Sequence, residues 1–234
     1  MGTVVQPVLL IVWKMRVSLV PTEVSESREK FLDSPEINYS NQSKRTFVIL
    51  QLKNNLREST ELQNGYLTSE LPHIVQLASE IHRAMNSGNK ILICGNGGSA
   101  ADAQHFAAEL TGRYLKERGA YPALALTTDT SALTAIGNDY GFEVIFSRQI
   151  EGLGKSGDIL IAISTSGQSA NIIKAVEASK TCGIRTIGLL GRDGGALKNL
   201  VDDAFIVPSQ VTARIQEIHE MILHFLCESM DALS

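Results

Sequence analysis

Residues 90–114 read KILICGNGGSAADAQHFAAELTGRY, and this stretch decides the fold. Its first five residues form a short apolar run bounded by charge and glycine, which is typical of a buried parallel strand. The turn GNGG follows directly, and Ser99 then opens an alanine-rich helical segment. A helix that begins beside a glycine turn exposes unpaired N–H groups and the positive end of its dipole, which favour anions. The stretch therefore predicts a strand, a loop and a helix around a polar or phosphorylated ligand.

Strand-like runs alternate with helical segments along the rest of the chain. This alternation predicts right-handed crossovers and a five-stranded parallel sheet with helices on both faces, an α/β fold. Ligands of such sheets bind at the carboxyl ends of the strands, near the point where the strand order reverses. The serine-rich loop STSGQS follows a strand directly and opens on the same edge as GNGG. The further strands are expected at 120–127, 158–164, 185–190 and 204–207, before a long C-terminal helix.

The N-terminal part divides into an extension and two amphipathic helices. Residues 1–45 have no sustained hydrophobic period and contain three prolines, so we expect an irregular or weakly ordered extension. Apolar residues recur every three or four positions over 47–63 and 73–86, which predicts two helices. The expected domain is therefore 46–234, with the helix pair included. The pair packs either within its own domain or against another subunit.

The composition is that of an ordinary globular protein, with 44% hydrophobic and 20% charged residues. The formal net charge is 21 − 25 = −4 and no basic run stands out, so we expect no nucleic-acid surface. The apolar run at 4–13 is too short for a membrane span, and its basic residues follow it, unlike those of a signal peptide. Three cysteines without CxxC spacing predict reduced thiols in a cytoplasmic protein.

Two helices carry candidate chemical groups. His105 and Glu109 stand four residues apart, so both project from one helix face, where they can form a metal site or a proton-transfer pair. Such a pair is also common on exposed helices without a function. The last helix carries a ladder at i, i+4 and i+8, and its pattern alone does not favour His224 over His219. The ladder consists of Gln216, Glu220 and His224.

The loop after the 158–164 strand brings four hydroxyl groups to the start of a helix. Hydroxyls and backbone amides at a helix N-terminus bind a phosphomonoester without lysine. Helix caps and turns also use these residue types, and we expect one of the four to be a cap. Phosphate binding is nevertheless the better interpretation of four together, which are Ser164, Thr165, Ser166 and Ser169.

Four motifs resemble the signatures of the sugar isomerase (SIS) domain family, specifically of its phosphoheptose isomerases. The resemblance runs from about residue 52 to the C-terminus. It implies a flavodoxin-like parallel sheet and a homotetramer with N-terminal helices in the oligomer packing and active sites between subunits. It also implies conversion of D-sedoheptulose 7-phosphate to D-glycero-D-manno-heptose 7-phosphate, the first step towards activated heptose. The motifs are GNGGSAADAQHFAAEL (95–110), TAIGNDYGFE (134–143), AISTSGQSANI (162–172) and RIQEIHEMILH (214–224).

The resemblance also implies roles for individual residues. One zinc ion per subunit is expected on His105, Glu109, Gln216 and His224, with Glu109 and His224 as the acid/base pair. A carboxylate and an imidazole suit isomerisation through an enediol, with Glu109 as the carbon base and His224 as the oxygen acid/base, or the reverse. His219 and Glu220 are expected to be structural, and Asp102 and Asp193, which lie near loops, are expected to be cap or turn residues. The implied substrate contacts are Asn96, Gly97, Gly98, Glu109, Asn138, Asp139, Ser164, Thr165, Ser166, Ser169 and Gln216.

Three other functions fit the same fold. Non-catalytic scaffolds that associate with a replication initiator resemble this family but lack the carboxylate and the imidazole that Glu109 and His224 provide here. A sugar-phosphate-sensing regulator would need a fused DNA-binding domain, which residues 1–45 do not supply. An isomerase of another sugar phosphate stays open, because the phosphate loop and the enediol chemistry are shared.

Overall fold

The structure is a computed structural model that describes residues 41–233. The chain divides into two compact units, Met1–Gln51 and Leu52–Ser234, and helix α3 (Asn41–Leu62) crosses the division. Residues 1–40 of the expected extension lie outside the described residues. Residues 41–45 form the first turn of α3, where an irregular chain was expected. Among the described helices, none is long and apolar enough to cross a membrane.

The two expected N-terminal helices are joined by a helical turn. A π-helical segment, Gln63–Leu67, connects α3 to α4 (Thr68–Asn86), so the break expected between the helices is absent. The backbone N–H and the hydroxyl of Thr68 both donate to the Gln63 carbonyl, five residues back, which closes the wider turn. Burial of Leu62 and Leu67 on either side holds this turn against the core. A hydrophobic period of about 3.6 residues identifies a helix but does not reveal the extra residue of a π-helical turn.

The second unit contains the expected five-stranded parallel sheet. Its strand order is β2-β1-β3-β4-β5, so the order reverses between β1 and β3. All residues of β1 and β3 are buried, because helices cover both faces. The strand ends put the glycine turn after β1 beside the serine loop after β3. The strands are β1 (Ile91–Gly95), β2 (Ala123–Ala125), β3 (Ile159–Ser164), β4 (Arg185–Gly191) and β5 (Asp203–Val207).

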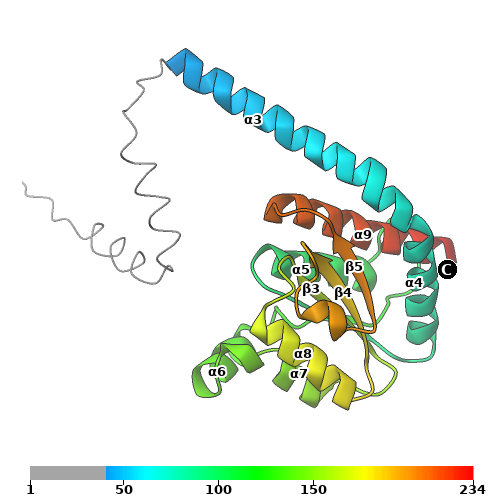
Figure 1. The fold of residues 1–234 in the computed structure, drawn as a ribbon. Helices are drawn as coiled ribbons and strands as arrows, with labels where there is room; N and C mark the ends of the chain where they lie inside the picture. Colours follow the sequence, from blue (N-terminus) through cyan, green and yellow to red (C-terminus); the bar gives the residue numbers. More distant parts are fainter. Residues whose placement is uncertain (1–40, 234) are drawn as a thin grey trace, which may run out of the picture. The chain divides into compact units, whose positions relative to one another are not determined.

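Helices cover the two faces of the sheet in separate groups. Helices α4, α5 and α9 pack on one face, and α7 and α8 pack on the other (Figure 1). Alternate strand residues supply each core, with Ile91 and Ile93 on the α5 face and Leu92 and Cys94 on the α8 face. Helix α5 thus starts where β1 ends and lies beside α9. The bounds are α5 (Gly98–Thr111), α6 (Thr130–Asp139), α7 (Ser147–Leu153), α8 (Ala170–Thr181) and α9 (Thr212–Leu233), with 3-10 turns at Phe142–Val144 and Leu197–Asn199.

Candidate active site

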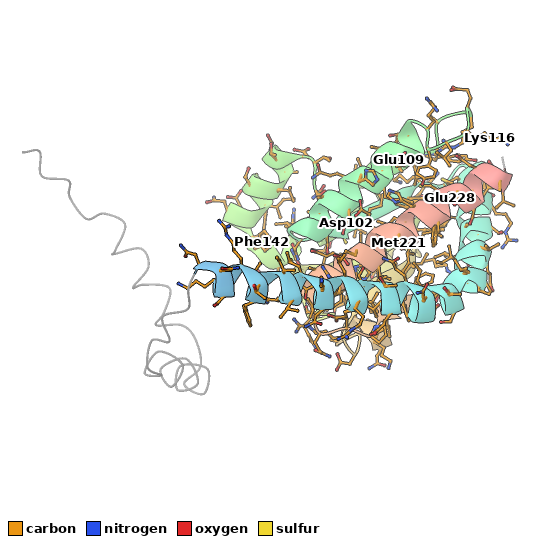
Figure 2. All side chains as sticks on the ribbon, turned by 90° about the horizontal axis from the view of Figure 1, so that it is seen from above. Asp102, Glu109, Lys116, Phe142, Met221 and Glu228 are labelled. Atoms are coloured by element: carbon orange, nitrogen blue, oxygen red, sulfur yellow. The ribbon has the colours of Figure 1, made fainter. Side chains whose placement is uncertain are left out.

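Helices α5 and α9 lie side by side on the same face of the sheet, and Figure 2 shows Asp102 and Glu109 on α5 next to α9. Spacings of three and four residues put Asp102, His105 and Glu109 on one face of α5. Spacings of four do the same for the ladder on α9. We call these two sets the α5 row and the α9 row, the second being Gln216, Glu220 and His224.

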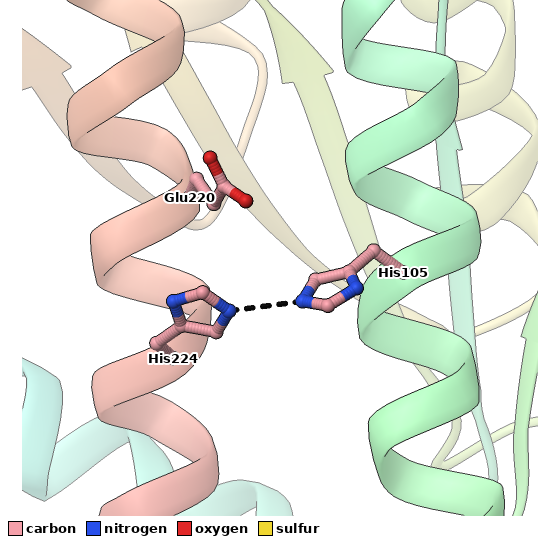
Figure 3. Close-up of side chains that lie close together, drawn as sticks. All are labelled: His105, Glu220 and His224. Atoms are coloured by element: carbon pink, nitrogen blue, oxygen red, sulfur yellow. Dashed lines mark hydrogen bonds between the residues drawn. The ribbon is translucent and has the colours of Figure 1, made fainter. Parts of the chain in front are cut away.

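The two rows meet at a pair of imidazoles (Figure 3). Nε2 of His105 lies 2.9 Å from Nε2 of His224, and the rings stand edge to face at 79°. Glu109 Oε1 lies 3.8 Å from the same His105 nitrogen. Three residues that the sequence predicts for the site are therefore together in the structure. Two ring nitrogens aimed at one point, with a carboxylate nearby, are a ligand set that suits zinc.

Glu220 joins this group, although the sequence analysis assigned it to structure. Ligand atoms of His105, Glu220 and His224 all lie within 4.8 Å of one another, and no other group of this kind occurs among residues 41–233. The signal that could have identified Glu220 was its place in the i+4 ladder between Gln216 and His224. That ladder puts all three side chains on the face of α9 that meets α5.

Gln216 lies at the other end of the α9 row, against the glycine turn. A Cβ atom at Gly98 would collide with the end of the Gln216 side chain, so the glycine allows this side chain to lie directly against the turn. Gly97 has a φ of 58°, which favours glycine for a second reason. The turn that begins α5 and the first turn of α9 are thus in direct contact. This contact puts the predicted substrate residues Gly97, Gly98 and Gln216 at one place.

Asp102 is a further member of the α5 row that the sequence analysis read as a cap or turn residue. Its Oδ2 is buried and has no hydrogen-bond partner in the described structure. Burial and the charge of Glu220 raise the pKa of Asp102 to about 6, against the opposing effect of His105. Perturbed carboxylates of this kind are concentrated at functional sites. Asp102 therefore lies within α5, close to Glu220 and His105, and is not a cap.

His219 lies behind the site. Its Nε2 donates to the Leu190 carbonyl at 3.0 Å, and the side chain is fully buried. Burial lowers the pKa of His219 to about 4, against the smaller effect of this hydrogen bond. A neutral, buried imidazole that holds α9 to β4 agrees with the structural role expected for His219.

The serine loop after β3 keeps its hydroxyls within the loop. The Gly167 N–H donates to Ser164 Oγ at 3.1 Å, and Ser164 Oγ and Ser169 Oγ are 3.2 Å apart. The Gln168 N–H donates to Ser166 Oγ at 3.2 Å. Ser169 occupies the N-cap position of α8, yet its side chain makes no cap hydrogen bond. One of the four residues was expected to be a cap, and Ser169 has the cap position, but its hydroxyl is turned into the loop beside the first N–H groups of α8.

Two other groups of predicted substrate residues have different environments. The Asn96 side chain is paired with the Asn171 side chain at the start of α8. Asn138 and Asp139 are exposed at the end of α6, where Asn138 Nδ2 donates to Asp139 Oδ1 at 2.7 Å. Within the described chain, no hydrogen bond or ion pair joins these two residues to the α5 and α9 rows. Like the serine loop, these two residues make no direct bond to the imidazole pair.

Known proteins match this chain in sequence and in structure. The model of the SIS domain family matches residues 56–191, more than half of the chain. Phosphoheptose isomerases from a Nitratiruptor species and from Helicobacter hepaticus are 59% and 55% identical, over 68% and 74% of this chain and 85% and 89% of the relatives. The phosphoheptose isomerase structure from Neisseria gonorrhoeae superposes with a TM-score of 0.74 at 45% identity, over 79% of this chain and 99% of that chain.

A second solved phosphoheptose isomerase, from Francisella tularensis, gives a TM-score of 0.73 at 39% identity, over 81% of this chain and 98% of that chain. All four relatives are covered over most of their own length. The chain therefore belongs to the SIS domain family and, within it, to the phosphoheptose isomerases.

Proposed function

We infer that this protein is an aldose–ketose isomerase that converts D-sedoheptulose 7-phosphate to D-glycero-D-manno-heptose 7-phosphate, the first step of activated-heptose biosynthesis. One observation carries the inference: proton-transfer groups on α5 and α9 face each other on two helices that both begin at the carboxyl edge of the sheet, where the hydroxyl-rich loop also lies. The curated relatives named phosphoheptose isomerase support the choice of substrate.

The chemistry requires two proton transfers. A base removes a proton from C1 of the ketose, which gives an enediol, and the same proton equivalent returns to C2. The second proton moves from the C1 oxygen to the C2 oxygen. We assign the carbon-bound proton to Glu109 and the oxygen-bound proton to His224, because a carboxylate and an imidazole both exchange protons near neutral pH.

The serine loop and the start of α8 are proposed to bind the phosphate group. The first N–H groups of α8 have no partner within the helix, and the dipole of the helix favours an anion there. The hydroxyls of Ser164 and Ser169 lie beside them and now bond only to each other and to the Gly167 amide. Thr165 and Ser166 complete this cradle, while Asn96, Gly97, Gly98, Asn138, Asp139 and Gln216 are proposed to contact the sugar.

A zinc ion fits the donor set between the two rows. We propose His105 and His224 as ligands, completed by Glu109 and Gln216, with Glu220 as a further carboxylate within reach. The fit rests on the two Nε2 atoms, which face each other at 2.9 Å, so that both rings direct a nitrogen into the same space. A bound zinc would polarise the sugar carbonyl and so ease removal of the neighbouring proton.

We further propose that the protein is a cytoplasmic homotetramer with active sites between subunits. The side chains of Leu52 and Leu56 on α3 are more than half exposed, and a partner subunit that packs on α3 would bury them. The separation of Asn138 and Asp139 from the imidazole pair is also consistent with a site completed by a second copy. Three free cysteines suit a reducing compartment.

Proton NMR of the purified protein with sedoheptulose 7-phosphate in deuterated water tests this function. The expected result is the aldose product with deuterium at C2, because the base exchanges its proton with solvent. Treatment with a chelator, followed by added zinc, shows whether activity follows the metal. Product that forms at an undiminished rate after the chelator would contradict the zinc proposal alone. A folded protein without turnover under every metal condition would contradict the isomerase and favour a scaffold function.

A further inference from the structure

The two loops that form the carboxyl edge of the sheet are joined by a pair of asparagines. Asn96 Nδ2 donates to Asn171 Oδ1, and Asn171 Nδ2 donates to Asn96 Oδ1, both at 2.8 Å. Asn171 is 3% exposed and Asn96 is partly buried, so the Asn171 side of this reciprocal pair is shielded from water. A buried amide pair that satisfies both partners is rigid, because breaking either bond leaves an unpaired polar group.

The pair spans the position where the strand order reverses. Asn96 follows β1, and Asn171 lies in the first turn of α8, which follows β3. Because β1 and β3 are neighbours in the sheet, the pair bridges the crevice in which ligands of such sheets bind. These two bonds are the only side-chain hydrogen bonds between the glycine turn (95–98) and the serine loop (164–169) or the first turn of α8, all of which the structure describes.

We propose that Asn171 is a positioning residue for the isomerisation: its pairing with Asn96 fixes the distance between the phosphate site and the sugar site. The inference rests on the proposed function. Asn171 belongs to the helix turn whose N–H groups would hold the phosphate, and Asn96 belongs to the turn that leads into the α5 row. The pair would therefore hold the phosphate site in a fixed position relative to the glycine turn and the start of α5.

The same serine loop is fixed on its other side by glycine packing. A Cβ atom at Gly167 would collide with the backbone of Gly194, and the Leu197 N–H donates to the Gly167 carbonyl at 3.1 Å. The serine loop is thus attached to the loop after β4 through its backbone. Beyond the pairing of Gly95 with Ile163 at the ends of β1 and β3, its connection to the glycine turn runs through the Asn171 side chain, which a single substitution can remove.

The geometry also changes the role of Asn96. Both polar atoms of its side chain bond to Asn171, so the Asn96 amide holds the turn in place and has only one N–H and one lone pair left for the sugar. Substitution of either asparagine should then have the same consequence, because each removes the same pair. This equivalence separates a positioning pair from two independent substrate contacts.

The test compares Asn171→Asp, Asn171→Ala, Asn96→Ala and the double alanine variant with the wild-type protein. Asn171→Asp keeps the shape but sets a carboxylate oxygen against Asn96 Oδ1, so one bond becomes a repulsion. We expect kcat to fall about 10- to 100-fold in each variant, since small misplacements of reacting groups have effects of this order. Competitive inhibition by inorganic phosphate should change by less than about twofold, because the phosphate cradle itself is intact.

Ser179→Ala is the matched control, because Ser179 is buried on the same helix and its hydroxyl has no partner in the described structure. Its kcat should equal that of the wild type. In the double alanine variant kcat should be no lower than in either single variant, which is the signature of one shared interaction. An active wild type with unchanged kcat in folded Asn171→Asp, or with additive losses in the double variant, would overturn the inference and leave the isomerase intact. An inactive wild type would overturn both.

Discussion

The amino edge of the sheet and the facing rows of α5 and α9 both contain clustered ionisable side chains. The two clusters differ in hydrogen bonding: the buried carboxylate Asp158 at the amino edge has a full set of donors, whereas the partly buried carboxylate Asp102 in the α5 row does not. At the amino edge, Asp158 is fully buried and accepts the N–H groups of Lys90 and Lys155, each at 2.9 Å, and also pairs with the Lys90 ammonium. Between α5 and α9, Asp102 has a buried oxygen without a partner, and the imidazoles of His105 and His224 face each other.

This difference separates groups that stabilise the fold from groups that are available for chemistry. A buried charge with a complete set of donors contributes to stability, and removal of one partner leaves the other uncompensated. A buried polar group without a partner lowers stability, and carboxylates with a perturbed pKa in such positions are concentrated where a ligand or a reaction uses them. We therefore expect substitutions in the two regions to change different observables.

The largest expected effect is on catalysis in the α5 and α9 rows. Glu109→Gln keeps the shape of the side chain and removes the base, and His224→Asn removes the imidazole. Each variant should lose about 10²- to 10⁴-fold in kcat while it stays folded, because each lacks one proton-transfer group. Turnover by NMR and unfolding by circular dichroism report the two quantities separately.

Glu177→Gln is the control for loss of a carboxylate. Glu177 lies on α8, is about half exposed and pairs only with Lys174 in the described structure, at 3.3 Å. It should leave kcat unchanged. Full activity in Glu109→Gln would refute its role as the base, and full activity in His224→Asn would move the oxygen-bound proton to another group.

The second prediction concerns a buried ion pair that joins the C-terminal ends of α5 and α9. Arg118 Nε donates to Asp231 Oδ1 at 3.0 Å, its other nitrogens donate to the carbonyls of Glu109 and Leu110, and the pair is almost fully buried. Arg118→Ala should lower the free energy of unfolding by about 3–5 kcal/mol, because Asp231 would lose its cationic partner.

Arg57→Ala supplies the contrast for this prediction. Arg57 pairs with Glu61 at 3.8 Å, and both side chains are 71% exposed. Urea unfolding should give nearly the wild-type stability for Arg57→Ala, because water screens an exposed pair. Equal stabilities for the Arg118 and Arg57 variants would show that burial and a complete donor set do not distinguish the two pairs.

The sequence predicts the sheet well because its signals are local. Apolar runs such as 91–95 and 159–164, ended by glycine or serine, determine strand positions to within a few residues. The same signals put the glycine turn and the serine loop on one edge. The π-helical turn at Gln63–Leu67 left no such signal, since its hydrogen bonds depend on the burial of residues on either side.

The site is only partly predictable, because spacing identifies a helix face but not what that face meets. The ladder on α9 put Glu220 beside His224, yet only the packing of α9 on α5 brings its carboxylate near His105. Asp102 was read as a local turn residue for the same reason. The pairing of Asn96 with Asn171 joins residues 75 positions apart, which no local pattern reports.

A smaller effect is expected where an aromatic ring packs against the imidazole of His224, the proposed acid/base group. The ring of Tyr114 stacks on that of His224 with centroids 5.7 Å apart at 26°, and its hydroxyl lies 3.4 Å from Glu228 Oε1. Tyr114→Leu should lower kcat about 2- to 10-fold, since such stacking contributes about 0.5–1.5 kcal/mol. Tyr114→Phe keeps the ring and should retain the wild-type kcat. Equal losses in both variants would assign the effect to the hydroxyl and not to stacking.

The smallest expected effect is a pH dependence of stability at the amino edge. Nδ1 of His73 lies 3.1 Å from Glu70, and its Nε2 lies 3.0 Å from Asp203, which also pairs with Arg185 at 3.5 Å. Burial lowers the pKa of His73, but the hydrogen bonds and charges of Asp203 and Glu70 outweigh it, so the pKa is raised above its usual value of 6.5. The charged form is therefore favoured in the folded state.

The sign of the dependence follows from linkage. A raised pKa in the folded state means that the stabilisation by His73 is complete below about pH 6.5, the unfolded value, and is lost as the pH rises through the folded value. The amount should be about 1 kcal/mol or less, because the imidazole is partly exposed. Urea unfolding of the wild type and of His73→Gln at pH 6 and pH 9 isolates this term, since Glu70, Asp203 and Arg185 are common to both proteins. The stability advantage of the wild type should shrink at the higher pH, and an advantage that grows would show that Glu70 and Asp203 do not favour a charged His73.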